Sequence, residues 1–585
     1  MRVVAALAAA LALLLSPAYA RADKFVLSVF HFNIQYVAGG LVGFSFLPDP
    51  ALDLDNDVIE DLIVTQSFAP VLDLYEKHPT WGTDIELQGY FLDVLAARHP
   101  AVLEKLRKLA KSGQIEVVSF HYSDQLFIGY PEEDWQRSQA LTAATFAKYD
   151  IPLSRTVFCQ EGQSGEAMAQ RFAEVGYRNM VWPKNLYSFQ HGDFDAAPLY
   201  QFGDGYMIAG GKGVSTTDVE VQWSFMDDGE LFATGDLNPY LADVFKTKPD
   251  VVKQKEDELL ALEAQGYQIT TVDKYVEAVK GQVTPVAPPP LLDGTWQPKS
   301  TTAVFKWLGA KGIWPGERDN HVRSLGALAH RELAAAETAA KVSGIDVRNR
   351  LDSAWRYLFL SEVTDASGIN PYRGETEYGL SHATEALRIA RSVINEAKAA
   401  MKATAVTIDP GAETMTSGAS DDPLVGEPTS APFELGVTAG DRSADVSWEQ
   451  IAAGHHRVSV HFGEGLTNEV SVSFPGELTD EFVVTRALAD TAPVSYKRSD
   501  FTFDAFYLAL PIGLISLGPN LFLIKDMSRV HLAAKITRDS GDIAFADQTL
   551  ADHDTPTWVF HVFEGSPQEA VDLARRINAV RKVTR

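Results

Sequence analysis

The sequence has a single cysteine, Cys159, so no disulfide can form within the chain, and packing alone must stabilise the fold. Long hydrophobic runs are also missing beyond the first twenty residues. A spanning helix needs about 18 apolar residues in a row. The most apolar later stretch, 507–524, is interrupted by Pro511 and two glycines and is followed by Lys525, which predicts core strands. We therefore expect no membrane span.

Basic residues are scarce relative to acidic ones. The chain has 51 Lys and Arg against 78 Asp and Glu, a formal net charge of −27. Nucleic acids and anionic membrane surfaces would repel such a chain, so we expect neither as a partner. At 585 residues the chain is too long for one hydrophobic core, which predicts several domains.

The first twenty residues have the pattern of a secretory signal peptide. Arg2 supplies a positive start, an apolar run follows, and Ala18-Tyr19-Ala20 is a small-x-small cleavage site. We expect cleavage after Ala20 and a mature protein that is periplasmic or secreted.

Three patterns follow one another along the rest of the chain. Short β-like runs alternate with helical patterns over 24–282, which predicts parallel strands with crossover helices. Helical patterns dominate after a proline-rich break, and alternating patterns typical of an antiparallel sandwich follow a second break. The predicted organisation is α/β, with a signal peptide at 1–20, a barrel domain at 21–285, a helical domain at 286–402, a linker at 403–432 and a β-sandwich at 433–585.

Polar side chains follow four of the predicted parallel strands at the point where each strand ends. They are His31, His121 with Asp124, Glu161, and the acidic turn at 227–230. The carboxyl ends of parallel strands converge in α/β folds, and active sites form there. Each residue taken singly fits an ordinary structural role, but four coincidences favour one shared site.

Two carboxylates from different strands, one acting as nucleophile and one as acid/base, are what glycoside hydrolysis requires. A metal site fits less well, because the first strand ends in His31-Phe32-Asn33 rather than His-x-Asp, and no two histidines stand four residues apart. We therefore predict neither a metal site nor a cofactor.

The order of these motifs resembles glycoside hydrolase family 57. His31 matches the histidine of the family's first motif, and 113–121 (GQIEVVSFH) matches the second, a glycine-led strand that ends in histidine. Phe-Cys-Gln-Glu at 158–161 stands where the family has Trp-x-Pro-Glu, and Asp228-Gly229-Glu230 matches Asp-x-Glu. LFLSEVTDASG (358–368) corresponds to the fifth motif, with alanine in place of its tryptophan.

The resemblance implies a retaining enzyme acting on α-glucans, with an incomplete (β/α)7 barrel whose open side is completed by the helical domain. It implies that Glu161 is the nucleophile and Asp228 the acid/base. The fifth motif would bring Glu362 and Asp365 over the barrel mouth, with Asp365 bonding sugar hydroxyls. The lost motif residues make a different sugar as consistent with the sequence as an α-glucan.

Further residues are candidates for lining the cleft. His31, His121 and Asp124 would bind sugar hydroxyls or the developing charge. Trp296 and Asp319 stand in aromatic and polar loops of the predicted helical domain. The sequence predicts a carbohydrate substrate and leaves the oligomeric state open.

Two alternatives stay open. A carbohydrate-binding or processing protein on a barrel that has lost its activity would explain the eroded motifs. A metal-dependent mannosidase or deacetylase could use a similar barrel. The sandwich is expected to be non-catalytic.

Overall fold

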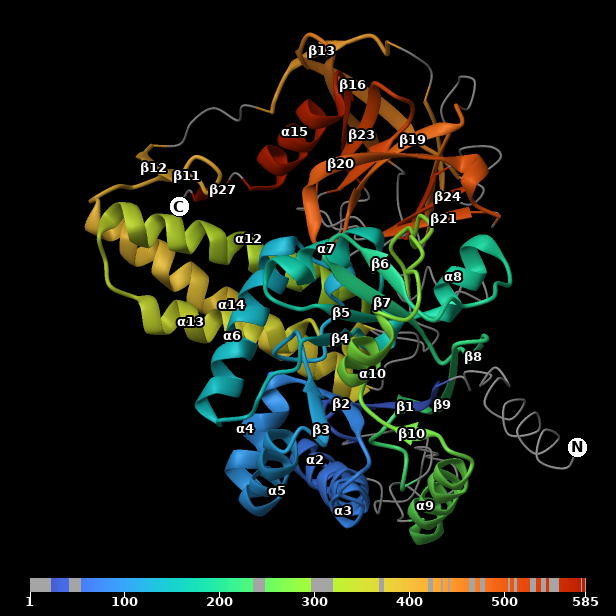
Figure 1. Cartoon of the computed structure of the whole chain (residues 1–585). Helices are drawn as coiled ribbons and strands as arrows, with labels where there is room; N and C mark the ends of the chain where they lie inside the picture. Colours follow the sequence, from blue (N-terminus) through green and yellow to red (C-terminus); the bar gives the residue numbers. More distant parts are fainter. Residues whose placement is uncertain are drawn as a thin grey trace, which may run out of the picture.

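A computed structural model gives the fold of the chain. It describes residues 23–41, 54–234, 248–295, 319–367, 373–418, 424–432, 435–439, 442–461, 469–473, 479–502, 505–509, 513–526, 533–537, 543–546, 557–579 and 581–583. The predicted signal peptide and Trp296 lie outside these residues. We refer to 23–295 as the α/β part, 319–400 as the helical part and 424–583 as the C-terminal β part (Figure 1).

Parallel strands form the centre of the α/β part. The first sheet has the order β3-β2-β1-β9-β8, and β10 also pairs with β1; all these pairings are parallel except that of β8 with β9. Eight of the ten residues of the central strand β1 are buried, as expected of a parallel strand covered on both faces. The strands are β1 (Asp23–Phe32), β2 (Thr83–Leu87), β3 (Ile115–Val118), β8 (Val214–Ser215), β9 (Val219–Asp228) and β10 (Gln268–Ile269).

A second sheet carries the strand that leads to Glu161. Its order is β4-β5-β7-β6, with β4, β5 and β7 parallel to one another. Its strands are β4 (Thr156–Phe158), β5 (Asn179–Pro183), β6 (Tyr200–Phe202) and β7 (Gly205–Gly210). The predicted alternation of parallel strands with helices is therefore confirmed. The strands pair in two sheets, and an incomplete (β/α)7 barrel stays a prediction.

Helices surround these sheets. They are α2 (Asn56–Ile63), α3 (Ala69–Lys77), α4 (Gly89–Arg98), α5 (Pro100–Lys111), α6 (Glu132–Lys148), α7 (Glu166–Glu174), α8 (Lys184–His191), α9 (Pro249–Ala264) and α10 (Val272–Val279). The pattern over 91–113 suggests one helix, but the structure has two that meet at His99. Pro100 explains the break, because proline disfavours helical backbone in the residue before it and suits the first turn of a new helix.

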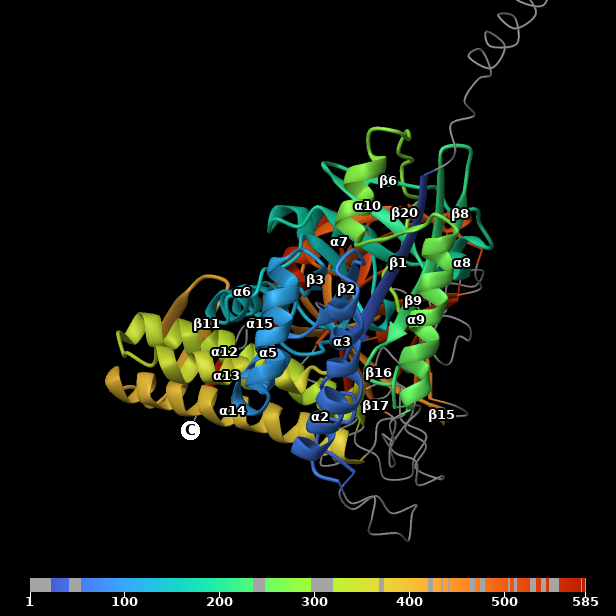
Figure 2. The ribbon, with the colours of Figure 1, turned by 60° about the horizontal axis from the view of Figure 1, so that its bottom comes forward.

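Three long helices make the helical part, α12 (Asp319–Ser343), α13 (Arg348–Ser361) and α14 (Arg373–Ala400). All three helices pack against one another, and α14 makes the most extensive contacts with the other two (Figure 2). The segment after α13 contacts the loop after β3, where Gln125 and Val363 form an antiparallel bridge. The helical part thus reaches the carboxyl ends of the parallel strands. None of the described helices is long and apolar enough to cross a membrane.

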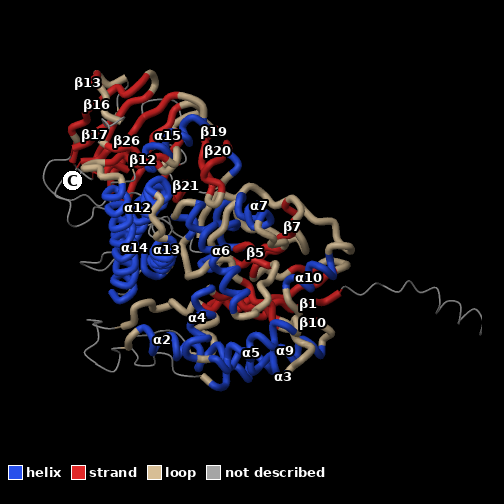
Figure 3. Tube along the Cα trace, turned by 90° about the vertical axis from the view of Figure 1, so that its left-hand side faces the viewer, coloured by secondary structure: helices blue, strands red, loops and turns tan. Residues whose placement is uncertain are grey.

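The C-terminal β part contains two antiparallel sheets, ordered β13-β16-β17-β26-β23-β22 and β15-β14-β18-β25-β24-β21 (Figure 3). Residues of both sheets, such as Val458 and Ile543, belong to one apolar core. The sandwich itself stays a prediction. The strands are β13 (Glu427–Thr429), β14 (Gly436–Ala439), β15 (Arg442–Ser443), β16 (Asp445–Ala452), β17 (His455–His461), β18 (Glu469–Ser473), β21 (Ala505–Ala509), β22 (Leu514–Ser516), β23 (Leu521–Lys525), β24 (Ala533–Thr537), β25 (Ile543–Ala546) and β26 (Thr557–Glu564).

The stretch predicted as a linker, 403–432, is partly ordered into strands. It holds β11 (Val406–Asp409) and β12 (Thr414–Ser417) as well as β13. Near the end of the chain, β27 (Arg581–Val583) follows helix α15 (Pro567–Ala579) and pairs with β11.

A hairpin of the C-terminal β part inserts into the α/β part. It consists of β19 (Glu481–Arg486) and β20 (Ala489–Lys497), and its tip residues Ala487 and Leu488 are buried in the same apolar core as Trp182. The backbone carbonyl of Leu488 accepts a hydrogen bond from Arg171 Nε at 2.7 Å. The two parts therefore share a core.

Truncating the tip should destabilise the whole protein. Leu488 is 2% exposed, so we expect Leu488→Ala to lower the free energy of unfolding by about 2–5 kcal/mol through the cavity it leaves. Thermal unfolding followed by circular dichroism measures this loss. The matched control is Leu260→Ala, because Leu260 is 41% exposed and its truncation should change stability by no more than about 0.5 kcal/mol. Equal melting temperatures for the two variants would show that the insertion contributes no stability.

Candidate active site

The carboxyl end of β1 lies at the centre of the site. His31 is in register with Glu86 of β2 on one side and with Asp228 of β9 on the other. Residues in register on parallel strands project from the same face of a sheet. The side chains of His31, Glu86 and Asp228 therefore project from the same face of the sheet.

Glu86 joins two histidines beneath the site. Its carboxylate bonds His31 Nδ1 at 2.5 Å and His121 Nε2 at 2.8 Å, and all three side chains are buried. Burial by itself would lower the pKa of His31, but the charges of Glu86, Asp124 and Glu230 raise it well above the usual value. The pKa of Glu86 is lowered, because the attraction of the two histidines outweighs its burial. His31 is therefore a buried imidazolium at neutral pH, paired with a carboxylate.

Asp124 lies on the other side of His31. Its Oδ1 lies 4.0 Å from His31 Nε2 and accepts a hydrogen bond from Gln88 Nε2 at 3.2 Å. Thr364 Oγ1, from the helical part, donates to its Oδ2 at 2.7 Å. Within the described part of the chain, His31 Nε2 makes no hydrogen bond. This nitrogen is a donor that a bound ligand could use.

Asp228 ends β9, and Glu230 follows two residues later. Burial chiefly raises the pKa of Asp228, the imidazolium of His31 opposes this, and Asp227 and Asp124 add to it. The pKa of Glu230 is raised well above its usual value by burial and then by Asp228, and its Oε2 accepts a hydrogen bond from Asn33 N at 3.1 Å. Asp228 is thus a partly exposed carboxyl group whose pKa lies above its usual value.

Gly229 allows these two carboxyl groups to approach β1. Its N–H donates to the backbone carbonyl of His31, and a Cβ at this position would lie 2.9 Å from that carbonyl oxygen and 2.9 Å from the Phe32 ring. Real Cβ atoms are essentially never so close to backbone. The glycine is therefore a requirement of packing at this point.

We expect Gly229→Ala to displace Asp228 and reduce turnover by about tenfold to a hundredfold, as displacements near 1 Å do in other active sites. Steady-state kinetics together with a melting curve measure this effect. Gly281→Ala is the control, since a Cβ there meets nothing within 4 Å. Full turnover in Gly229→Ala would mean that Asp228 tolerates displacement and is a poor candidate for catalysis.

Glu161 lies just beyond β4 in a short 3-10 turn, Gln160–Gly162. Its backbone has φ +54°, the left-handed region that residues with a side chain rarely adopt. Gln160 and Gln163 are both buried, and their side-chain amides donate to the backbone carbonyl of Gln125 at 2.6 and 2.9 Å. Two buried amides thus fix a strained turn, and the carboxylate of Glu161 remains partly exposed between them.

Asp365 connects Glu161 to the rest of the cluster. Asn33 Nδ2 donates to its Oδ2 at 2.7 Å. Its pKa is raised well above the usual value by burial and then by the charges of Glu375, Glu161, Asp124 and Glu230. The helical part therefore places a carboxyl group within electrostatic reach of both Glu161 and Glu230.

The structure brings most of the predicted site residues together, and their roles stay predictions. Asp124 interacts with His31, Asp228 and Asp365, and Glu161 interacts with Asp365. His121 is connected to this set through its hydrogen bond with Glu86.

Three other candidates are not part of this set. Glu362 belongs to a separate buried network, in which its Oε2 accepts from Gln125 Nε2 at 2.6 Å. Asp319 begins α12, and its side chain is not described; Trp296 lies outside the described residues.

Glu86 and Asn33 are site residues that the sequence reasoning missed. Among the described residues, no group of three or more His, Cys, Asp or Glu side chains has the geometry to hold a metal ion.

Comparison with known proteins shows which fold this chain resembles. No family model matches the sequence. An α-mannosidase from Enterococcus faecalis V583 superimposes with a TM-score of 0.62 at 10% identity, covering 97% of this chain and 90% of that one. The chain has a glycoside hydrolase-like fold. It is a mixed α/β protein with parallel sheets and helices.

The expected similarity to family 57 is also found, at a distance. A GH57-type branching enzyme from Pyrococcus horikoshii superimposes with a TM-score of 0.42 at 12% identity, over 64% of this chain and 88% of that chain. Alpha-amylase 1 of Dictyoglomus thermophilum is 30% identical over 78 residues. That match spans 13% of this chain and only 11% of the length of the amylase.

Proposed function

We propose that the protein is a carbohydrate-active enzyme, a retaining glycoside hydrolase or transglycosidase. The observation that supports this proposal is a set of charge interactions at the carboxyl ends of the parallel strands: Glu161 acts on Asp365, and Asp124 acts on both Asp365 and Asp228. The glycoside hydrolase-like fold and the short amylase match support the same class.

In this proposal the Glu161 carboxylate attacks the anomeric carbon while Asp228 gives its proton to the leaving oxygen. Asp228 then takes a proton from water or from a sugar hydroxyl, and that oxygen displaces Glu161. Such a mechanism needs the acid to hold its proton near neutral pH, and burial raises the pKa of Asp228 in that direction. A retaining pair also requires the two carboxyl groups to lie about 5–5.5 Å apart.

The surrounding residues suit a sugar substrate. His31 Nε2 would donate to a hydroxyl group, and Asp124 and Asp365 would accept from others. The substrate is proposed to be an α-linked oligo- or polysaccharide met in the periplasm or outside the cell, in keeping with the N-terminal signal pattern.

The decisive experiment screens the purified protein against α- and β-linked oligosaccharides and follows the first product anomer by NMR. Retention of the anomeric configuration supports the proposal, and inversion contradicts it. Products longer than the substrate would identify transglycosylation. If no glycan is turned over although some bind, the second candidate, a binding protein on an inactive hydrolase fold, replaces the first.

A metal-dependent mannosidase is the other candidate, and its support is the likeness of fold to an α-mannosidase. The experiment that distinguishes it is treatment with a chelator followed by zinc. Loss of turnover on chelation and recovery with zinc would favour this alternative. Turnover that chelation leaves unchanged would favour the two-carboxylate mechanism.

A further inference from the structure

Thr364, in the turn after α13, connects the helical part to the cluster around His31. Its side chain is fully buried, and its hydroxyl donates to Asp124 Oδ2 at 2.7 Å. Its backbone N–H donates to the Asp124 carbonyl, also at 2.7 Å. One residue of the helical part therefore holds both the backbone and the carboxylate of Asp124.

The segment around Thr364 is also held by contacts that do not use its side chain. Leu126 N donates to the backbone carbonyl of Glu362 at 2.9 Å, and Gln125 and Val363 form an antiparallel bridge. These contacts are made by the backbone, so they persist whatever side chain stands at position 364. Replacing the Thr364 side chain therefore removes one hydrogen bond and leaves the segment docked.

The hydroxyl of Thr364 acts on the charge of Asp124. Burial chiefly raises the pKa of Asp124 and Glu86 adds to this, whereas His31, His121 and the hydroxyl lower it. The charge of Asp124 is in turn one of those that raise the pKa of His31. Because a donor to a carboxylate favours its ionised form, the Thr364 hydroxyl favours an ionised Asp124 beside a protonated His31.

Other ionisable groups surround this pair. Those that face His31 and Asp124 are Glu86 of β2, His121 after β3, Asp228 and Glu230 at the end of β9, and Asp365 of the helical part. Within the described chain, the Thr364 hydroxyl bonds none of these five groups. A change in the charge of His31 on altering Thr364 would therefore report on Asp124.

From this arrangement we infer that Thr364 is a positioning residue of the proposed active site, which holds Asp124 in place as the charged partner of His31. The inference rests on the proposed function, in which His31 and Asp124 bind hydroxyl groups of the sugar. Thr364 itself does not touch substrate in this role. The helical part then serves the site twice, through the carboxyl group of Asp365 and through the hydroxyl of Thr364.

Titration of His31 by NMR tests the charge effect without any substrate. In protein containing ¹³C-labelled histidine, the Cε1–H signal that is lost in His31→Gln belongs to His31. Thr364→Val and Thr364→Ala both lack the hydroxyl, and each should move the midpoint of this signal to lower pH by at least about 0.5 pH unit. Thr364→Ser keeps the hydroxyl and should titrate like the parent protein.

Steady-state kinetics on a substrate from the glycan screen test the effect on turnover. Thr364→Val should lower kcat/KM by about tenfold, because one hydrogen bond to a charged group of the site is lost. Thr364→Ser should retain most of the parent activity. The basic limb of the pH profile should move to lower pH in Thr364→Val, together with the titration of His31.

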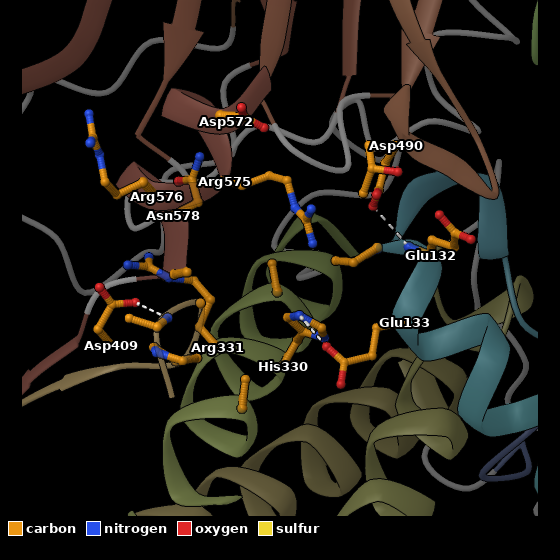
Figure 4. Close-up of a pocket in the computed structure, with 18 of the residues that line it drawn as sticks. Glu132, Glu133, His330, Arg331, Asp409, Asp490, Asp572, Arg575, Arg576 and Asn578 are labelled. Carbon is orange, nitrogen blue, oxygen red and sulfur yellow. Dashed lines mark hydrogen bonds and ion pairs between the residues drawn. The ribbon is translucent and has the colours of Figure 1, made fainter. Parts of the chain in front are cut away.

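A second polar contact between the helical and α/β parts supplies the control. His330 of α12 bonds Asp134 of α6 through Nδ1 at 2.6 Å and lies 4.0 Å from Glu133, at the cleft lined by α6, α12 and α15 (Figure 4). His330→Gln should lower the melting temperature and leave the midpoint of His31 unchanged. The reason is that His330 is not among the main charges acting on His31 or Asp124.

The inference is overturned if Thr364→Val and Thr364→Ala titrate like the parent protein. It is also overturned if Thr364→Ser is displaced as far as Thr364→Val, since packing and not the hydroxyl would then matter. An equal displacement in His330→Gln would contradict it as well, because any loosening of the helical part would suffice. If the parent turns over no glycan, the proposed function fails, and the titration still decides whether Thr364 controls the charge of His31.

Discussion

Replacing Glu161 with glutamine is expected to lower turnover by about a thousandfold or more, because the amide cannot form the covalent intermediate. Melting temperature should be unchanged, since the side chain is partly exposed and its neighbours hold the turn. Steady-state kinetics on the substrate found by the glycan screen measure the loss. Glu174→Gln, an exposed position on the helix that follows, serves as the matched control and should retain full turnover.

A sharper form of this experiment uses Glu161→Gly. Glycine adopts φ +54° without strain, so this variant should be at least as stable as the parent protein. It removes the carboxylate and leaves room for a small anion. Added azide should restore turnover and yield a glycosyl azide of inverted configuration. A Glu161→Gly protein that is folded, inactive and unresponsive to azide would remove Glu161 from the nucleophile's role.

The second large effect is expected at Glu86. Glu86→Gln removes the charge that faces the buried imidazolium of His31, and breaking a buried pair in this way costs about 3–5 kcal/mol of folding free energy. His121 loses its carboxylate partner as well. We expect a clear drop in melting temperature near pH 6 and a loss of turnover.

The pH dependence of this drop reports the charge on His31. The pKa of His31 is raised above 6.5, so its share of the stabilisation is complete below that pH and disappears as pH rises through the raised value. The pKa of Glu86 is lowered below 4.5, so its share is complete above that pH and disappears as pH falls through the lowered value. The difference in melting temperature between parent and variant should therefore be largest at about pH 4.5–6.5 and shrink on either side.

Melting curves recorded across this pH range measure the difference. Glu104→Gln is the control, because Glu104 is 69% exposed and pairs only at the surface. A difference that stays constant with pH would mean that His31 is not charged in the folded protein.

The strand ends of the α/β part were predictable because a single rule governs them. Parallel strands bring their carboxyl ends together, so His31, Asp124, Glu161 and Asp228 could be assigned to one site from chain order alone. Glu86 obeys the same rule but was missed. Its strand, TDIEL, carries two carboxylates and has the composition of an exposed segment, yet every residue in it is buried. Glu86 is buried because its carboxylate bonds two histidines, His31 of β1 and His121, which follows β3.

Two other features of the structure could not be predicted from local sequence patterns. Glu362 and Asp365 are three residues apart in one motif, but only Asp365 contacts the end of β1, through Asn33. The course of the backbone after α13 places Asp365 next to Asn33 and Glu362 next to Gln125. The insertion of Leu488 into the core of the α/β part joins residues more than 300 positions apart, and neither apolar periodicity nor turn composition encodes such a partner.

That insertion sets an order of events during synthesis. The ribosome completes the α/β part long before Leu488 is made. Until then, the apolar core around Trp182 lacks the hairpin tip that packs against it. A nascent chain in this state exposes apolar surface and would be a substrate for chaperones. The core that Cys159, two residues before Glu161, shares with Trp182 is therefore complete only when Ala487 and Leu488 have been synthesised.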